Sequence, residues 1–287
     1  MERKRLLSNW RAWTMAGALI AIWVVFSIAT GGTFLLPRNL SLLARQMSVT
    51  SILAVGMVLV IVAGQIDLSV GALAGLCGAL AALAYTRLDW PLALAFLAAL
   101  AVGAVLGALQ GSLTAWLRIP PFIVTLGGML LFQGALLAVT GGVSISPARP
   151  FLAVGQAYLP QPVGWIGAAL IAVALGIAAA RAETGRRRAA LAVLAVAVLA
   201  AVAVMNAYEG VPVPVLVVLA LAALLSTVAR QTPFGRHLYA IGGNREAAFY
   251  SGIAIERHLV GVFTLMGLLA GAAGVVLTAR EIGRAHV

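Results

Sequence analysis

The chain has 287 residues, of which 63% are hydrophobic and 9% are charged. Soluble domains carry about a quarter charged residues, so an ordinary soluble protein is excluded. No series of alternating segments of about ten residues indicates a membrane β-barrel. The basic residues behind the net charge of +11 are spread over separate loops, which argues against nucleic-acid binding. The sequence therefore predicts an all-α fold, that of a polytopic helical membrane protein.

Nine stretches are long and apolar enough to cross a membrane, which takes about 20 residues. They are residues 12–30, 47–64, 69–85, 91–117, 122–140, 163–180, 189–207, 212–229 and 259–279. The charged start, Met-Glu-Arg-Lys-Arg, leads into the first stretch, and no small-residue cleavage site follows. We therefore interpret the first stretch as a transmembrane helix and not as a removed signal peptide.

The orientation follows from the Lys and Arg residues of the loops, which are enriched on the cytoplasmic side. With a cytoplasmic N-terminus and every stretch crossing, thirteen of these residues lie inside and four lie in outside loops. The N-terminus, Arg181–Arg188 and Thr232–His258 are therefore predicted to face the cytoplasm. The Gly/Pro-rich segment Thr140–Pro162 is predicted to be a surface connection on the outer side.

Asp67 is the one acidic residue between the second and third stretches. An ionisable residue near membrane depth indicates a functional site, here a role in the substrate path or in gating. Alternatively, Asp67 or Ser69 could cap the third helix by binding its free amides. Three further polar residues could either line a path or bind a neighbouring helix, namely Gln65, Thr125 and Gln133.

The segment Thr232–His258 is the longest polar and charged stretch between two apolar ones. Gly242 and Gly243 are expected to break the chain, and Asn244 to cap a two-turn helix over Arg245–Ser251. Glu246 would lie in the first turn of this helix, and Gly252 would end it. The segment is either a solvated loop or a docking helix for a soluble partner, with Phe249 and Tyr250 exposed.

No catalytic motif, metal-ligand spacing or phosphate-binding loop is visible, so the sequence predicts neither an enzyme nor a cofactor of its own. If ATP is used, another subunit must bind it. The last seven residues, Glu281–Val287, are hydrophilic, unlike the apolar chain before them. We predict that residues 281–287 are not native and that the genuine chain continues past Arg280.

Three blocks together resemble the permease subunits of bacterial sugar ATP-binding-cassette (ABC) importers of the ribose/xylose/arabinose type. They are Leu53–Gly71, Ile119–Gly134 and Phe234–Ile253. Val154–Pro160, the basic loop Arg181–Arg188 and Gly210–Val215 favour the xylose branch of this family. The resemblance implies a permease domain over residues 1–280 whose C-terminal part is missing, with a coupling loop at 232–258.

The resemblance also implies the partners: a cytoplasmic ABC ATPase, a periplasmic sugar-binding protein and a second permease copy in the bacterial inner membrane. Importer permeases carry Glu-Ala-Ala, three residues and then Gly where they meet the ATPase, and Glu246, Ala247, Ala248 and Gly252 have this spacing. The residues expected to couple to the ATPase are Gly243, Asn244, Glu246, Ala247, Ala248, Phe249, Tyr250 and Gly252. The alternative is a stand-alone secondary transporter or channel for a small solute, which would need buried carboxylates within its spans.

Overall fold

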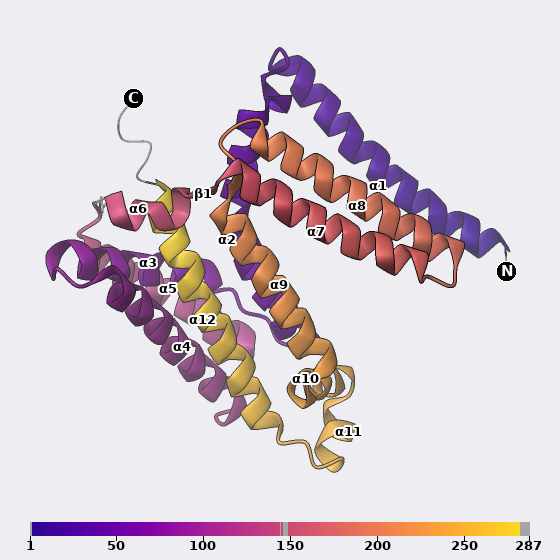
Figure 1. Ribbon diagram of the computed structural model, residues 1–287. Helices are drawn as coiled ribbons and strands as arrows, with labels where there is room; N and C mark the ends of the chain where they lie inside the picture. The colour runs from indigo at the N-terminus through magenta and orange to yellow at the C-terminus, as the bar shows by residue number, and fades with distance from the viewer. Residues whose placement is uncertain (1, 144, 146–148, 282–287) are drawn as a thin grey trace. The chain divides into compact units, whose positions relative to one another are not determined.

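The computed structural model describes residues 2–143, 145 and 149–281, and most of them are helical (Figure 1). The helices before residue 141 are α1 (Glu2–Ala29), the 3-10 helix η1 (Thr33–Leu35), α2 (Pro37–Val62), α3 (Val70–Arg87), α4 (Leu92–Ala115) and α5 (Pro121–Thr140). Those after it are α6 (Arg149–Gln156), α7 (Gln161–Ala180), α8 (Gly185–Asn206), α9 (Val213–Gln231), α10 (Pro233–Gly243), α11 (Arg245–Tyr250) and α12 (Ile255–Glu281). Two short strands, β1 (Tyr158–Leu159) and β2 (Val211–Pro212), pair with each other.

Eight helices of the described chain are long and apolar enough to cross a membrane: α2–α5, α7–α9 and α12. Each matches one of the predicted stretches, which confirms the polytopic helical fold. The remaining predicted stretch, residues 12–30, corresponds to α1, whose apolar described part, Gly17–Ala29, is shorter. The largest boundary errors are at the starts of α1 and α2. These helices begin at Glu2 and Pro37, each ten residues before its predicted start at residue 12 or 47.

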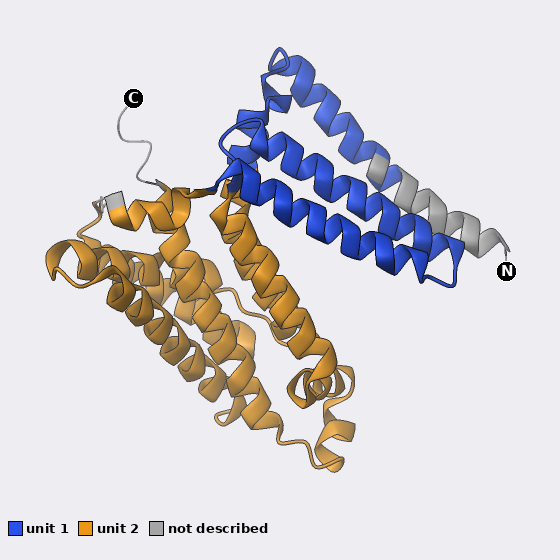
Figure 2. Cartoon of the chain, viewed as in Figure 1, with its two compact units in different colours: residues 1–43, 159–211 blue, residues 44–158, 212–287 orange. Residues whose placement is uncertain are grey.

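The chain divides into two compact units, residues 1–43 with 159–211 and residues 44–158 with 212–287 (Figure 2). In the first unit, α7 and α8 lie side by side as a hairpin (Figure 1). Both ends of the hairpin are fixed by side chains. Arg188 Nε donates to Ala179 O at 3.3 Å, and Asn206 Nδ2 donates to Gln161 O at 3.1 Å.

Helix α12 forms the centre of the second unit, where it packs against α4 and α3 (Figure 1). Glycines allow the backbones to touch. A β-carbon on Gly103 of α4 would meet the carbonyl oxygen of Gly267, and one on Gly267 would meet that of Gly103. On the other side, a β-carbon on Gly78 of α3 would meet the carbonyl oxygen of Gly274. Small residues allow this close approach in membranes, where the hydrophobic effect does not drive helices together.

The segment after α5 is more than the surface connection that the sequence suggested. Its helix α6 packs on α12, and Phe151 is fully buried with its ring 5.7 Å from that of Tyr85. Gln156 Nε2 also donates to Ala279 O at 3.2 Å. The prediction was therefore wrong for residues 149–156, because a short apolar helix there completes the core of the second unit.

Candidate functional site

A buried polar cluster lies in the second unit, where the chain passes from α2 to α3. Alternate residues of this irregular segment are buried: Ala63, Gln65, Asp67 and Ser69. The apolar side chains between them, Ile66 and Leu68, are 53% and 40% exposed. This arrangement, with polar groups inside and apolar groups outside, is the reverse of a soluble loop and is expected of a segment that meets lipid on one side.

Asp67, Ser69 and Gln110 form one hydrogen-bonded chain. Asp67 Oδ1 accepts from Ser69 N at 2.8 Å and from Ser69 Oγ at 2.7 Å. Gln110 Nε2, which comes from α4, donates to Ser69 Oγ at 3.0 Å. Because Gln110 Nε2 is the donor in this contact, the single hydroxyl proton of Ser69 remains available for the hydrogen bond to the Asp67 carboxylate.

The capping role that was left open for Asp67 and Ser69 is not observed. Ser69 occupies the N-cap position of α3 but makes no side-chain cap bond, and Asp67 binds the amide of Ser69 itself. Asp67 is thus the first residue of a local turn that precedes the helix. Burial raises the pKa of the Asp67 carboxyl, and the hydrogen bonds from the side chain and backbone of Ser69 act against that shift.

Two of the other predicted polar residues join this region, and one does not. Gln65 is buried, and its Nε2 donates to Ala63 O at 3.1 Å. Thr125 is fully buried, with its Oγ1 donating to Pro121 O at 2.8 Å within α5. Gln133 is exposed, two turns further along α5, and lies outside the cluster because α5 turns that face away from the unit.

Sequence reasoning missed Gln110 and Thr114 of α4. Both are buried, at 3% and 5% exposed, and a β-carbon on Gly128 of α5 would meet Gln110 Nε2. The available signal was that Gln110 is the one amide in the apolar stretch 91–117, since a strongly polar side chain within a span indicates a helix–helix contact or a path.

The predicted helix of the polar segment is confirmed as α11. Asn244 Oδ1 accepts from Ala247 N at 2.9 Å, as an N-cap does. Glu246 lies in the first turn. Gly252 has φ +79°, and its amide donates to Phe249 O at 3.0 Å, which ends the helix. The helix ends at Tyr250, one residue before the predicted end.

Helix α11 exposes an aromatic pair. Phe249 is 61% exposed and Tyr250 is 79% exposed, and their ring centroids lie 5.7 Å apart. Ala248, which precedes them in the helix, is buried. Glu246, Ala247, Asn244 and Gly243 are also exposed. Ala248 is thus the buried side chain of α11, and the two aromatic side chains remain exposed.

The expectation that Gly242 and Gly243 break the chain is wrong. They are the last two residues of α10, a helix that the sequence did not suggest, and Asn244 is the residue that leaves it. Gly242 is needed because its backbone touches the end of α2, where a β-carbon would meet Val62 O. Helix α10 thereby contacts the start of the segment that carries Asp67.

A histidine pair joins α10 to α12. His237 Nδ1 lies 3.0 Å from His258 Nε2, and Phe234 stacks on the His258 ring with centroids 5.6 Å apart. His258 Nδ1 lies 2.7 Å from Ala254 O, and since a carbonyl oxygen can only accept, the ring nitrogen is the donor in this contact. These contacts connect the polar segment to the first turn of the central helix.

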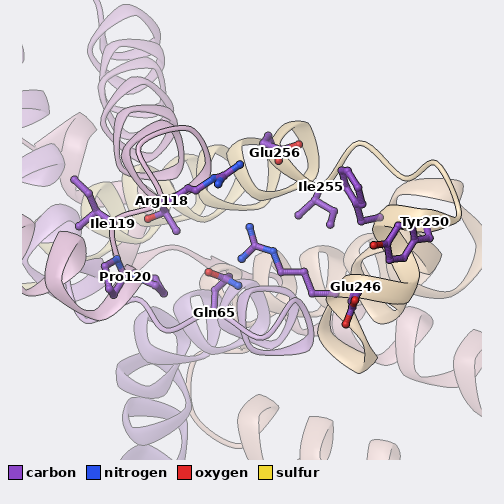
Figure 3. A pocket seen from close by; sticks show the side chains of 12 residues that line it. Gln65, Arg118, Ile119, Pro120, Glu246, Tyr250, Ile255 and Glu256 are labelled. Atoms are coloured by element: carbon purple, nitrogen blue, oxygen red, sulfur yellow. The ribbon is translucent and has the colours of Figure 1, made fainter.

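A pocket of about 550 Å³ lies where three segments of the second unit meet. They are the segment with Gln65, the α4–α5 connection with Arg118–Pro121, and the part from Arg245 to Glu256 (Figure 3). Figure 3 shows Gln65 and Arg118 on one side of this space and Tyr250 and Ile255 on the other. All three segments belong to the side that the charge distribution predicts to be cytoplasmic.

Comparisons with known proteins agree with this architecture. A family described as "Branched-chain amino acid transport system / permease component" matches residues 39–285. The chain is 42% identical to the xylose transport system permease protein XylH of Escherichia coli K12, over 95% of this chain and 72% of XylH.

Two further permeases are similar to the chain at lower identity. The XylH protein of Haemophilus influenzae is 40% identical over 95% of this chain and 76% of its own length. The ribose import permease protein RbsC of E. coli K12 is 33% identical over 94% of this chain and 71% of RbsC. No solved structure matches the chain significantly.

Proposed function

This chain belongs to the branched-chain amino acid transport system permease family, and from that premise we propose that it is the permease subunit of an ABC importer for a monosaccharide. The proposed cargo is D-xylose or a related sugar, because the XylH proteins share 40% and 42% identity with the chain and the ribose permease shares 33%. The proposed location is the bacterial inner membrane, with a cytoplasmic N-terminus. The eight apolar helices support a membrane location.

The observation that carries the proposal is the exposed helix α11. Two turns lie far below the length at which an isolated helix persists in water, so α11 depends on its caps and on its contacts. Its aromatic pair, Phe249 and Tyr250, is of the kind that dominates protein interfaces. We infer that these two rings enter a groove of a cytoplasmic ATPase, while Glu246 in the first turn stabilises the helix start or pairs with a basic group there.

The contacts of α11 also supply a route for coupling. Ile253 N donates to Ala248 O at 3.1 Å, so the turn at Gly252 joins α11 closely to α12. Helix α10 is tied to α12 through the histidine pair and to the end of α2 through Gly242. A movement of the ATPase would therefore displace α10, α11 and the lower part of α12 together.

The remaining partners follow from the same proposal. A periplasmic sugar-binding protein delivers the cargo, and a second permease copy completes the path. The chain needs no cofactor and catalyses no reaction, because ATP is bound and hydrolysed by the partner subunit. Residues 1–280 form the permease domain with a coupling loop at 232–258. The proposed non-native tail at 281–287 lies almost entirely outside the described residues.

The test is D-xylose uptake by cells that produce this permease, completed beyond Arg280, with its ATPase and binding protein. We expect Phe249→Ala and Gly252→Val to abolish uptake and the stimulation of ATP hydrolysis by loaded binding protein. Gly252→Asn is the matched control, because Asn tolerates the positive φ that Val does not. Trp165→Ala, at an exposed aromatic of α7, controls for the loss of a ring.

Membrane abundance is measured for every variant, so that loss of coupling is separated from loss of protein. Near-normal uptake by both Phe249→Ala and Gly252→Val would show that α11 is an ordinary loop segment. The competing function is a stand-alone secondary transporter or channel, which the buried carboxylate of Asp67 favours. That function predicts uptake without the ATPase, and the same assay with the ATPase deleted distinguishes the two.

A further inference from the structure

The pocket beside α11 has the chemical character of a site for a neutral polyhydroxylated molecule. Four charged side chains line it, Arg118 and Arg245 with Glu246 and Glu256. Figure 3 labels Arg118, Glu246 and Glu256. Within the described residues, none of the four forms an ion pair or hydrogen bond through its side chain. Two guanidinium groups that donate and two carboxylates that accept suit a ligand rich in hydroxyl groups, because each hydroxyl can both accept and donate a hydrogen bond.

The other residues that line the pocket also suit a sugar. Gln65 adds an amide, and Ile119, Pro120 and Ile255 add apolar surface on which the C–H groups of a sugar ring can pack. The volume of about 550 Å³ lies within the usual range for small-molecule sites and leaves room for a pentose with bound water. A phosphate or carboxylate ligand would meet two carboxylates here, and an apolar ligand would make no hydrogen bonds with the four charged groups.

The backbone at Arg118 is held in an unfavourable conformation. Its φ of +56° lies in the left-handed region, although Arg has a β-carbon. Such residues persist where the surrounding structure determines them, and they gather at functional sites. Here the conformation brings the chain from α4 around to Pro120 and Pro121 and leaves the Arg118 side chain at the pocket.

A line of polar residues leads from the pocket to the buried cluster. Gln110, Thr114 and Arg118 are spaced four residues apart, which places the first two on one face of α4 and the third just beyond its end. Gln110 binds Ser69, while Thr114 and Arg118 line the pocket. Thr114 Oγ1 is buried and has no hydrogen-bond partner in the structure.

We propose that this pocket is a monosaccharide site at the end of the permease that carries α11, the last position of the sugar before its release. The inference rests on the proposed function, because the sugar is the cargo assigned there. The sugar must bind weakly for release to occur, with a Kd on the order of 1 mM. The sugar lies between α11 and the α4–α5 connection, so its departure frees α11 to move with the ATPase.

The experiment measures D-xylose binding to the purified chain in lipid nanodiscs, without ATPase or binding protein, by saturation-transfer difference NMR. We expect saturable binding in the wild type and a loss of about tenfold or more in Arg118→Gln and in Glu256→Gln. That is the effect of removing one charge-assisted hydrogen bond. Arg230→Gln and Glu183→Gln, at exposed charges outside the pocket, are the matched controls and should bind as the wild type does.

Thermal melting of each variant verifies that it is folded. The absence of saturable xylose binding in the wild type would overturn the proposal, and so would wild-type affinity in both pocket variants. Binding of inorganic phosphate that depends on Arg118, with no xylose binding, would assign an anion site and also overturn it. Uptake by the complete transporter separates the two claims. Uptake without pocket binding refutes this inference alone, and pocket binding without uptake refutes the proposed function.

Discussion

Replacing Asp67 by Ala and by Asn separates its role as a hydrogen-bond acceptor from its role as a charge. Asp67 Oδ1 accepts two hydrogen bonds from Ser69 and has no basic partner in the described structure. An Asn at this position keeps the acceptor oxygen and removes the charge, whereas Ala removes both. The acceptor role therefore predicts different effects of the two substitutions, and a gating charge predicts similar ones.

The magnitude for Asp67→Ala follows from the contacts that are lost. The Ser69 hydroxyl still has Gln110 as a partner, but the buried Ser69 amide loses its only acceptor among the described residues. An unsatisfied buried donor costs about 1–3 kcal/mol, and the lost bond to the hydroxyl adds about 1 kcal/mol. We expect a total of about 2–4 kcal/mol, equivalent to a fall in Tm of roughly 4–16 °C for a chain of this size.

The Asn variant should lack the pH dependence that the Asp67 carboxyl gives to the stability of the wild type. Burial raises the pKa of Asp67, so ionisation weakens the native state. This penalty is absent below the unfolded-state pKa and develops as the pH rises through the higher native pKa. Asp67→Asn does not ionise. Its Tm should therefore equal or exceed that of the wild type at neutral pH, and the difference should shrink as the pH is lowered.

The assay is thermal melting of the purified proteins between pH 4 and pH 8, combined with sugar uptake by the complete transporter. If the acceptor role is correct, Asp67→Asn melts at or above the wild-type temperature at neutral pH and retains uptake, and Asp67→Ala is impaired in both. The reasoning is refuted if Asp67→Asn loses uptake as fully as Asp67→Ala while remaining folded. Asp67 would then act through its charge.

Two further predictions concern the polar segment and its contacts. Ser251→Cys should react with an impermeant thiol reagent from the cytoplasmic side, and Val143→Cys should react from the outer side. Both variants are made in a background without the native cysteine. Labelling of Ser251→Cys from outside alone would contradict the topology. Gly242→Ala should lower both Tm and uptake, because its β-carbon would meet Val62 O, whereas Gly243→Ala, with open space around it, should be neutral. Equal effects of the two alanine substitutions would show that the contact between α10 and α2 does not matter.

The sequence predicted the long helices and α11 well because their signals are local. A run of about 20 apolar residues has few alternatives to a spanning helix. The caps of α11, Asn244 and Gly252, each act within three or four residues of their own position. Helix α10 was missed because two consecutive glycines, Gly242 and Gly243, suggest a break. The structure shows that glycine is required at position 242 of this helix, because a β-carbon there would meet Val62 O.

The polar cluster and the pocket could not be predicted in the same way, because they depend on which helices become neighbours. Gln110 and Ser69 are 41 residues apart and meet because α4 and α3 both pack on α12. That packing in turn depends on contacts such as Gly103 with Gly267. The sequence contains 31 glycines, and nothing local distinguishes one that touches a carbonyl oxygen from one such as Gly127, which has open space around it. In a membrane the apolar side chains do not select a partner, since lipid is as apolar as leucine. The arrangement that places Arg118 beside α11 is thus encoded in pairs of small residues far apart in the chain.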